Sequence, residues 1–159
     1  MQILISDANI FIDLEDGELL DKLFQLRFTF KTPDILYSEE LEAQHSHLIE
    51  NGLQLTELNE TSMHYAMALV AQSSGPSTND CFALASAKQE GCPLLTGDDA
   101  LRKLAKKEGV VVMGTLWIVE QMVHGQAISV DEAKDAYSKM KVAGSRLPWD
   151  LAFSRLDEI

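Results

Sequence analysis

Short apolar runs alternate with longer amphipathic segments along most of the chain. Apolar, β-prone runs of strand length recur at residues 3–5, 28–32, 53–58, 94–96 and 110–113. Segments with helical spacing or helix-capping residues lie between them, at 19–26, 35–51, 59–72, 80–87 and 98–107, and further helices are predicted from residue 115 onward. This alternation predicts an α/β domain with a mostly parallel sheet and helices on both of its faces.

The most informative stretch is PSTNDCFALASAKQEGCPLLTGDDALRKLA, residues 76–105. Its DCFALASA segment is apolar nearly all round, which predicts a helix that is buried on most faces and capped by Ser77 or Thr78. The run at 94–96 predicts a buried parallel strand that turns directly into the next helix. The acids of this stretch stand at two chain reversals: Asp80, then Asp98 and Asp99.

Composition places the chain among globular proteins of one domain, because it has 159 residues and 46% hydrophobic content. No apolar run reaches the length of a membrane span, and the N-terminal residues form no basic leader. A cytoplasmic protein without membrane attachment is therefore expected. Cys81 and Cys92 lack metal-binding spacing and are interpreted as small buried hydrophobes.

The net charge of −12 argues against a protein that coats nucleic acid nonspecifically. The charge is also uneven, because residues 1–87 carry −11 and residues 88–159 carry −1. A polyanion is therefore expected to approach over the second half of the chain. Divalent cations held by carboxylates would offset part of the acidic excess.

Asp7 is the most conspicuous single residue, because it interrupts an apolar run over residues 3–12. A carboxylate inside such a run is costly unless it is paired, hydrogen-bonded or bound to a metal. Asp7 is predicted to stand at the end of the first strand. The competing interpretation is an N-cap for a helix that begins at Ala8.

Four acids are candidates for one site: Asp7, Glu40, Asp80 and Asp98. The first and last end predicted strands, where ligands bind in open parallel sheets, and Asp80 begins the buried helix. Glu40 lies on the helix after the second strand; the adjacent Glu39 is the second choice, and a solvated helix face is the alternative for both.

Carboxylates packed together repel one another and take up protons unless a cation compensates, so the four acids are interpreted as a divalent metal site. Their hard oxygen ligands suit Mg²⁺ or Mn²⁺. One or two such ions could activate water and stabilise the leaving oxygen of a phosphodiester. Asn9 and Thr96, beside two of the acids, could orient them or bound water, and ordinary turn hydrogen bonds would explain these residues equally well.

Four segments carry a resemblance to a known family: LISDANIFIDL, TPDILYSEEL, STNDCFALASAKQEG and LLTGDDALRKLAKKEGVVVMGT. In their order and spacing, over residues 1–120, they resemble the successive motifs of the PIN domain family. The resemblance implies a three-layer α/β/α nuclease domain over residues 1–120. It also implies a C-terminal helical extension, residues 121–159, packed on the same domain.

The resemblance further implies a Mg²⁺- or Mn²⁺-dependent endoribonuclease, as in the toxin components of VapBC-type toxin-antitoxin pairs. Asp7, Asp80 and Asp98 would hold the metal, and Glu40 would share in catalysis. The implied supporting positions are Asn9, Thr96 and Asp99, the last as a water-mediated ligand or only as a first-turn helix charge. RNA is the implied substrate, an antitoxin protein a candidate partner, and a homodimer the candidate assembly.

Other polar and aromatic residues have less specific interpretations. The bases after the acidic turn are candidates for contacts with an RNA backbone, or for ordinary charges near a helix C-terminus: Arg102, Lys103, Lys106 and Lys107. Trp117 and Trp149 are interpreted as core or interface residues rather than base-stacking groups. The acidic run 13–18 is interpreted as a solvated surface. His45 and His47 are expected to diverge on one helix, and no histidine is expected to bind metal.

Two other functions compete with the nuclease interpretation. A catalytically quiet PIN-like module, held by a protein partner through its apolar helices, would bind neither Mg²⁺ nor Mn²⁺. A phosphotransfer domain would place a phosphate-accepting aspartate at a strand end. The phosphotransfer alternative is disfavoured, because the acceptor motif of the haloacid dehalogenase family would need another acid at Asn9 and no lysine stands ready to complete a receiver site.

Overall fold

A computed structural model describes the whole chain, residues 1–159. Five strands form one sheet in the order β3-β2-β1-β4-β5, and every pairing is parallel. The strands are β1 (Gln2–Ser6), β2 (Phe28–Pro33), β3 (Gln54–Thr56), β4 (Leu94–Leu95) and β5 (Val112–Met113). The predicted α/β class and mostly parallel sheet are confirmed.

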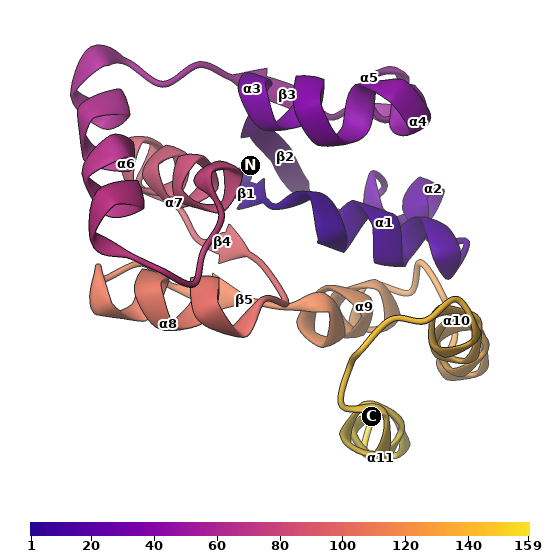
Figure 1. Ribbon diagram of the computed structural model, residues 1–159. Helices are drawn as coiled ribbons and strands as arrows, with labels where there is room; N and C mark the ends of the chain where they lie inside the picture. The colour runs from indigo at the N-terminus through magenta and orange to yellow at the C-terminus, as the bar shows by residue number, and fades with distance from the viewer.

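Helices cover both faces of the sheet and make a three-layer α/β/α domain (Figure 1). One face is covered by α7 (Thr78–Glu90) and α8 (Asp99–Lys107), with α6 (Glu60–Gln72) packed on the outer side of α7. The other face is covered by α1 (Ala8–Asp16), α2 (Leu20–Leu23) and α9 (Thr115–His124). None of the helices combines the length and apolar character needed to cross a membrane.

The last two helices follow α9 on the same side of the sheet. α10 (Val130–Val142) packs against α1 and α9, and α11 (Trp149–Asp157) packs against α10. The ring of Tyr137 in α10 meets the rings of Trp149 and Phe153 in α11 at centroid distances of 5.9 and 5.8 Å. These aromatic contacts join the two helices through apolar surface.

The buried helix α7 forms where the sequence predicts it. All seven of its residues from 81 to 87 are buried, which matches the apolar DCFALASA pattern. Ser77 is the N-cap and Thr78 already belongs to the helix. Gly91 ends the helix in the left-handed conformation, at φ 65°, which a glycine adopts without strain.

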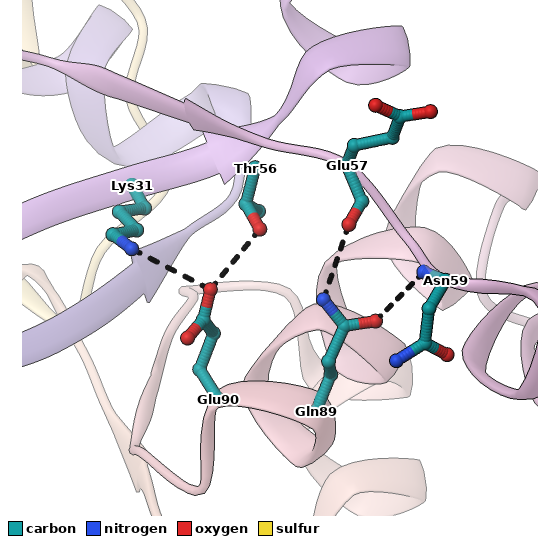
Figure 2. A network of polar contacts seen from close by, with 6 residues as sticks. All are labelled: Lys31, Thr56, Glu57, Asn59, Gln89 and Glu90. Carbon is teal, nitrogen blue, oxygen red and sulfur yellow. Dashed lines mark hydrogen bonds and ion pairs between the residues drawn. The ribbon is translucent and has the colours of Figure 1, made fainter.

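The C-terminal end of α7 is anchored to the sheet and to the chain before α6 (Figure 2). Four contacts make this anchor: Lys31 Nζ to Glu90 Oε1 at 3.5 Å, Thr56 Oγ1 to the same oxygen at 3.1 Å, Gln89 Nε2 to the Glu57 carbonyl at 3.1 Å, and the Asn59 N–H to Gln89 Oε1 at 2.9 Å. Because these contacts fix one end of α7, they also restrict where its other end, with Asp80, lies.

The prediction of a single helix over residues 35–51 is wrong. The segment divides into α3 (Asp34–Leu36), a π-helical turn η1 (Tyr37–Leu41), α4 (Glu42–His45) and α5 (His47–Asn51). Tyr37 and Leu41 are buried, whereas the three residues between them are exposed. A π turn accommodates one more residue than an α turn, so η1 changes the direction of every later side chain, and π turns are frequent at functional sites.

The interpretation of residues 13–18 as a solvated acidic run is wrong for Asp13. This residue lies in α1, is half-buried, and accepts a hydrogen bond from Ser145 Oγ at 2.6 Å. Burial raises the pKa of its carboxyl group against the effect of that hydrogen bond. The contact joins α1 to the segment between α10 and α11, 132 positions further along the chain.

Candidate active site at the carboxyl edge of the sheet

The strand order places a topological switch point between β1 and β4. The chain leaves β1 toward β2 on one side and leaves β4 toward β5 on the other, so the two connections diverge at this point. In open parallel sheets ligands bind where connections diverge in this way, beyond the carboxyl ends of the strands. Asp7 follows β1 directly, and Thr96 to Asp98 follow β4.

Asp7 is buried at this switch point, with 3% of its surface exposed. Its Oδ1 accepts the Ile10 N–H at 3.1 Å and so caps α1, while its Oδ2 accepts a short hydrogen bond from the Thr96 hydroxyl. Burial raises the pKa of Asp7 to about 7, outweighing both hydrogen bonds, and the charges of Asp80 and Asp13 raise it further. Asp7 is therefore an N-cap and, at the same time, an acid without charge compensation.

Thr96 connects Asp7 to the turn that carries Asp98. Its fully buried hydroxyl donates to Asp7 and accepts the Asp98 N–H at 3.1 Å. Asp98 caps α8, because its Oδ2 accepts the Leu101 N–H at 2.8 Å. The sequence predicts Asp98 as the first helical residue, whereas the structure places it one position before the helix.

Asp80 lies in the first turn of α7 and closes a capping box with Ser77. Its Oδ2 accepts the Ser77 N–H at 3.0 Å, and its own N–H donates to Ser77 Oγ at 3.1 Å. The charge of Asp80 raises the pKa values of both Asp7 and Glu40. Asp80 is therefore the electrostatic link between the acid after β1 and the acid on η1.

Glu39 and Glu40 are both exposed on the π turn η1, and their surroundings differ. Glu39 Oε2 accepts a hydrogen bond from Asn79 Nδ2 at 2.9 Å. The pKa of Glu40 is raised by partial burial, lowered by a hydrogen bond with Asn79, and raised again by Asp80 and Glu39. Glu39 therefore makes the 2.9 Å side-chain contact with α7, and Glu40 is the glutamate whose pKa the charge of Asp80 raises, so both stay candidates for the acidic group.

The four candidate acids are thus gathered at one edge, but they do not form a ready metal site. No three His, Cys, Asp or Glu side chains come close enough together to hold an ion as they stand. The donor chemistry fits Mg²⁺ or Mn²⁺. A bound cation would stabilise the ionised form of Asp7, which burial disfavours most and the charges of Asp80 and Asp13 disfavour further. Three-carboxylate coordination requires these side chains to come closer together than they lie in this structure.

The other predicted residues lie on α1 and α8, which both begin at this edge. Asn9 and Asp99 are exposed, in the first turns of α1 and α8. Lys103 and Lys106 are exposed on α8, and Lys106 in its last turn fits a cation that complements a helix C-terminus. Arg102 does not fit that interpretation, because it lies in the first turn and is half-buried.

Asn79 is a site residue that sequence reasoning missed. It precedes Asp80, contacts Glu39 through its Nδ2, and holds its Oδ1 buried without a hydrogen-bond partner. An amide at this position can donate to one carboxylate while its carbonyl oxygen stays available. The sequence signal for Asn79 is its position in the STND segment, directly before Asp80. An amide beside an acid is common at helix caps, so this position did not distinguish it.

The expectation that His45 and His47 diverge is wrong. The helix is interrupted between α4 and α5, and both rings turn toward Glu15 of α1. His45 Nδ1 makes a short contact with Glu15 Oε2, and His47 Nε2 lies 3.3 Å from Glu15 Oε1. These contacts join the segment after η1 to α1, and the group does not have the geometry of a metal site.

Fold and site together define a class: a three-layer α/β/α domain with acids at the switch point of an all-parallel sheet. A sequence model described as a PIN domain matches residues 3–159, so the chain belongs to the PIN domain family. The match covers the C-terminal helices as well as the sheet. PIN domains are in general nucleases that use divalent metal ions. None of the curated proteins compared with the chain matches it.

Proposed function

We propose that the protein is a divalent-metal-dependent endoribonuclease that hydrolyses RNA phosphodiester bonds with Mg²⁺ or Mn²⁺. The observation that carries this proposal is the buried Asp7, whose pKa is raised to about 7 at a switch point where Asp80 and, through Thr96, Asp98 are gathered around it. A buried acid of this kind is costly to keep, and structural capping alone does not require burial.

The four acids have two parts in the proposed mechanism. Asp7, Asp80 and Asp98 would hold the cation, which when bound supplies positive charge that activates water and stabilises the leaving oxygen. The Thr96 hydroxyl fixes the orientation of Asp7. Glu40 is suited to accept a proton from the attacking water, because its raised pKa makes it a stronger base than an ordinary carboxylate.

The helices add to the binding of an anionic substrate. Asp7 and Asp98 cap α1 and α8, and Asp80 lies in the first turn of α7, so three helix N-termini adjoin the acids. The N-terminus of a helix carries partial positive charge and unpaired N–H groups. These N-termini would favour a phosphate at the acidic edge despite the negative charge of the carboxylates.

Asp7→Asn and Asp98→Asn test the assignment directly. Each variant is expected to abolish RNA cleavage in Mg²⁺ or Mn²⁺ while unfolding at nearly the same temperature or higher. Asp16→Asn is the matched control, because Asp16 is an exposed acid at the end of α1, and it should cleave like the wild-type protein. Undiminished cleavage by both purified site variants would rule the assignment out.

The proposal extends to the biological setting implied by the family resemblance. A toxin of a toxin-antitoxin pair would act in the cytoplasm, form a homodimer and be held inactive by an antitoxin. Induced expression of the protein is then expected to arrest growth, and the Asp7→Asn variant is expected not to. Growth arrest by both proteins would separate toxicity from cleavage and contradict the toxin proposal.

A catalytically quiet interaction module is the second candidate. One observation favours it: the site acids serve as helix caps and gather into no three-carboxylate metal group. Calorimetric titration of the folded wild-type protein with Mn²⁺ distinguishes the two functions. Heat of binding that disappears in Asp7→Asn supports the nuclease, and no binding by the wild-type protein supports the quiet module.

A further inference from the structure

A groove of about 600 Å³ opens beside Asp98 and gathers arginines from distant parts of the chain. The chain has four arginines, and three of them line this groove: Arg102, Arg146 and Arg155. The only acid in its lining is Asp99. In a protein with a net charge of −12, this concentration of guanidinium groups is a local reversal of charge.

One of the three arginines serves the fold. Arg155 of α11 makes a two-point contact with Glu120 of α9, Nε to Oε2 at 2.8 Å and Nη2 to Oε1 at 2.6 Å. Glu120 is buried, with 7% of its surface exposed, so it needs this partner. The pair holds α11 against α9 and thereby builds one wall of the groove.

The other two arginines have no acidic partner. Neither Arg102 nor Arg146 takes part in an ion pair. Arg102 stands in the first turn of α8, where the helix dipole disfavours a cation, so helix stability does not explain it. Arg146 lies exposed between α10 and α11. Both guanidinium groups are free to bind an external anion.

Arg102 is held close to the acidic edge. Its Nη1 lies 3.0 Å from the point that a Cβ on Gly114 would occupy, and the Thr96 carbonyl oxygen lies 3.6 Å from that point. The absence of a side chain at Gly114 therefore lets the guanidinium group lie against the backbone next to the turn of Asp98. Gly97 and Asp99, the two neighbours of Asp98, also line the groove.

The groove also has an aromatic wall. Trp117 lines it while its ring packs against Phe28 at a centroid distance of 5.7 Å. Leu147, Pro148 and Leu151 extend the apolar lining. Free guanidinium groups beside an aromatic ring are the combination that single-stranded nucleic acid requires, because phosphates pair with arginine and bases stack on the ring. An acidic peptide would use only the arginines.

We infer that this groove binds the stretch of single-stranded RNA that adjoins the cleaved phosphodiester, with Arg102 and Arg146 on its phosphates and Trp117 against a base. The C-terminal helices would then supply part of the substrate surface as well as stability. The inference rests on the proposed ribonuclease for the identity of the strand, and binding can be measured without cleavage.

The test is the affinity for a short fluorescein-labelled single-stranded RNA, measured by fluorescence anisotropy in EDTA over a series of salt concentrations. Arg102→Gln and Arg146→Gln are each expected to weaken binding roughly fivefold or more and to reduce the salt slope by about 0.7. Arg27→Gln is the matched control: it removes the fourth arginine, which is exposed before β2 and outside the groove, and should change affinity less than about twofold.

Two further measurements keep the inference falsifiable. Gly114→Ala keeps the charge and requires the flexible end of Arg102 to give by only a few tenths of an ångström, so it should weaken binding less than Arg102→Gln does. In a Trp149→Phe protein, Trp117 is the remaining tryptophan, and RNA is expected to quench its emission. Absence of quenching would contradict the stacking contact.

The outcomes separate this inference from the proposed function. RNA binding that depends on Arg102 and Arg146, without cleavage in Mg²⁺ or Mn²⁺, would support RNA binding in the groove and contradict the proposed nuclease activity. Equal binding by the wild-type protein and both groove variants would overturn the groove whatever the cleavage result. Polyglutamate that binds more tightly than RNA, and loses affinity in the same variants, would assign the groove to an acidic protein partner and overturn the inference.

Discussion

Asp7 is a helix cap and, at the same time, a buried acid. The sequence offers the N-cap and the costly acid in an apolar run as competing interpretations of this residue, and in the structure both descriptions apply. The contact from Thr96 to Asp7 could not be derived from the residues alone, because 89 positions separate them and only the pairing of β1 with β4 brings them together. Residue types therefore indicated the candidates, and strand order determined their partners.

The burial of Asp7 makes stability depend on pH in metal-free buffer. The carboxyl titrates near 3.8 in an ordinary environment and near 7 in the fold, so between these values the folded state holds a proton that the unfolded state has lost. Stability is therefore lost as pH rises toward 7. Asp7→Asn has no carboxyl group to titrate at this position and avoids the loss. The difference in free energy of unfolding between this variant and the wild-type protein should therefore rise by up to about 3 kcal/mol from pH 5 to pH 8, in favour of the variant.

Urea denaturation at the two pH values, in EDTA, measures this difference. Asp16→Asn, an exposed acid on the same helix, should differ from the wild-type protein by the same amount at both. A constant difference for Asp7→Asn as well would show that Asp7 is already ionised in the fold at pH 5, contrary to the expected protonation.

At the scale of elements, helix ends were easier to predict than helix interiors. Ser77 is an N-cap as expected, because a side-chain oxygen near a free N–H is a local interaction that a short sequence contains. The π turn η1 was missed, because apolar spacing around Tyr37 and Leu41 is equally compatible with an α-helix. The π turn changes the directions of the side chains in this segment, so the surroundings of Glu39 and Glu40 could not be predicted from helical spacing.

The cap of α7 supports a quantitative prediction. Ser77→Ala removes the side chain that accepts the Asp80 N–H, and should lower the free energy of unfolding by about 1 kcal/mol. Thr78→Ala is the comparison, because Thr78 lies inside the helix and is exposed, and it should change stability by less than about 0.5 kcal/mol. Chemical denaturation measures both, and a larger effect from Thr78→Ala would mean that the cap is assigned to the wrong residue.

At the scale of the whole molecule, the acidic first half and the nearly neutral second half meet at the switch point between β1 and β4. The charge asymmetry, readable from the sequence, predicted that a polyanion approaches over the second half. The sequence did not indicate which basic residues line one groove, since Arg102 and Arg146 are 44 positions apart. They share the groove only because α11 packs back toward α9. Long-range packing, rather than composition, assembles the proposed substrate surface.

The Glu120–Arg155 pair is expected to hold the C-terminal helix in place. Arg155→Leu leaves the buried Glu120 without a partner and should lower the free energy of unfolding by about 1–2 kcal/mol. Lys134→Gln is the comparison, because its pair with Asp157 also joins α10 to α11 but is exposed, and it should cost less stability than Arg155→Leu does. Equal losses in urea denaturation would contradict a special role for the buried pair.

The central claim is that Asp7, Asp80 and Asp98, distant along the chain, share a divalent cation. Diffraction from crystals soaked in Mn²⁺, with data collected at the manganese absorption edge, tests this claim most directly. The predicted result is an anomalous peak at the carboxyl edge of β1 and β4, coordinated by these three carboxylates and absent in Asp7→Asn. A peak elsewhere, or no peak in crystals of a protein that still cleaves RNA, would contradict the claim.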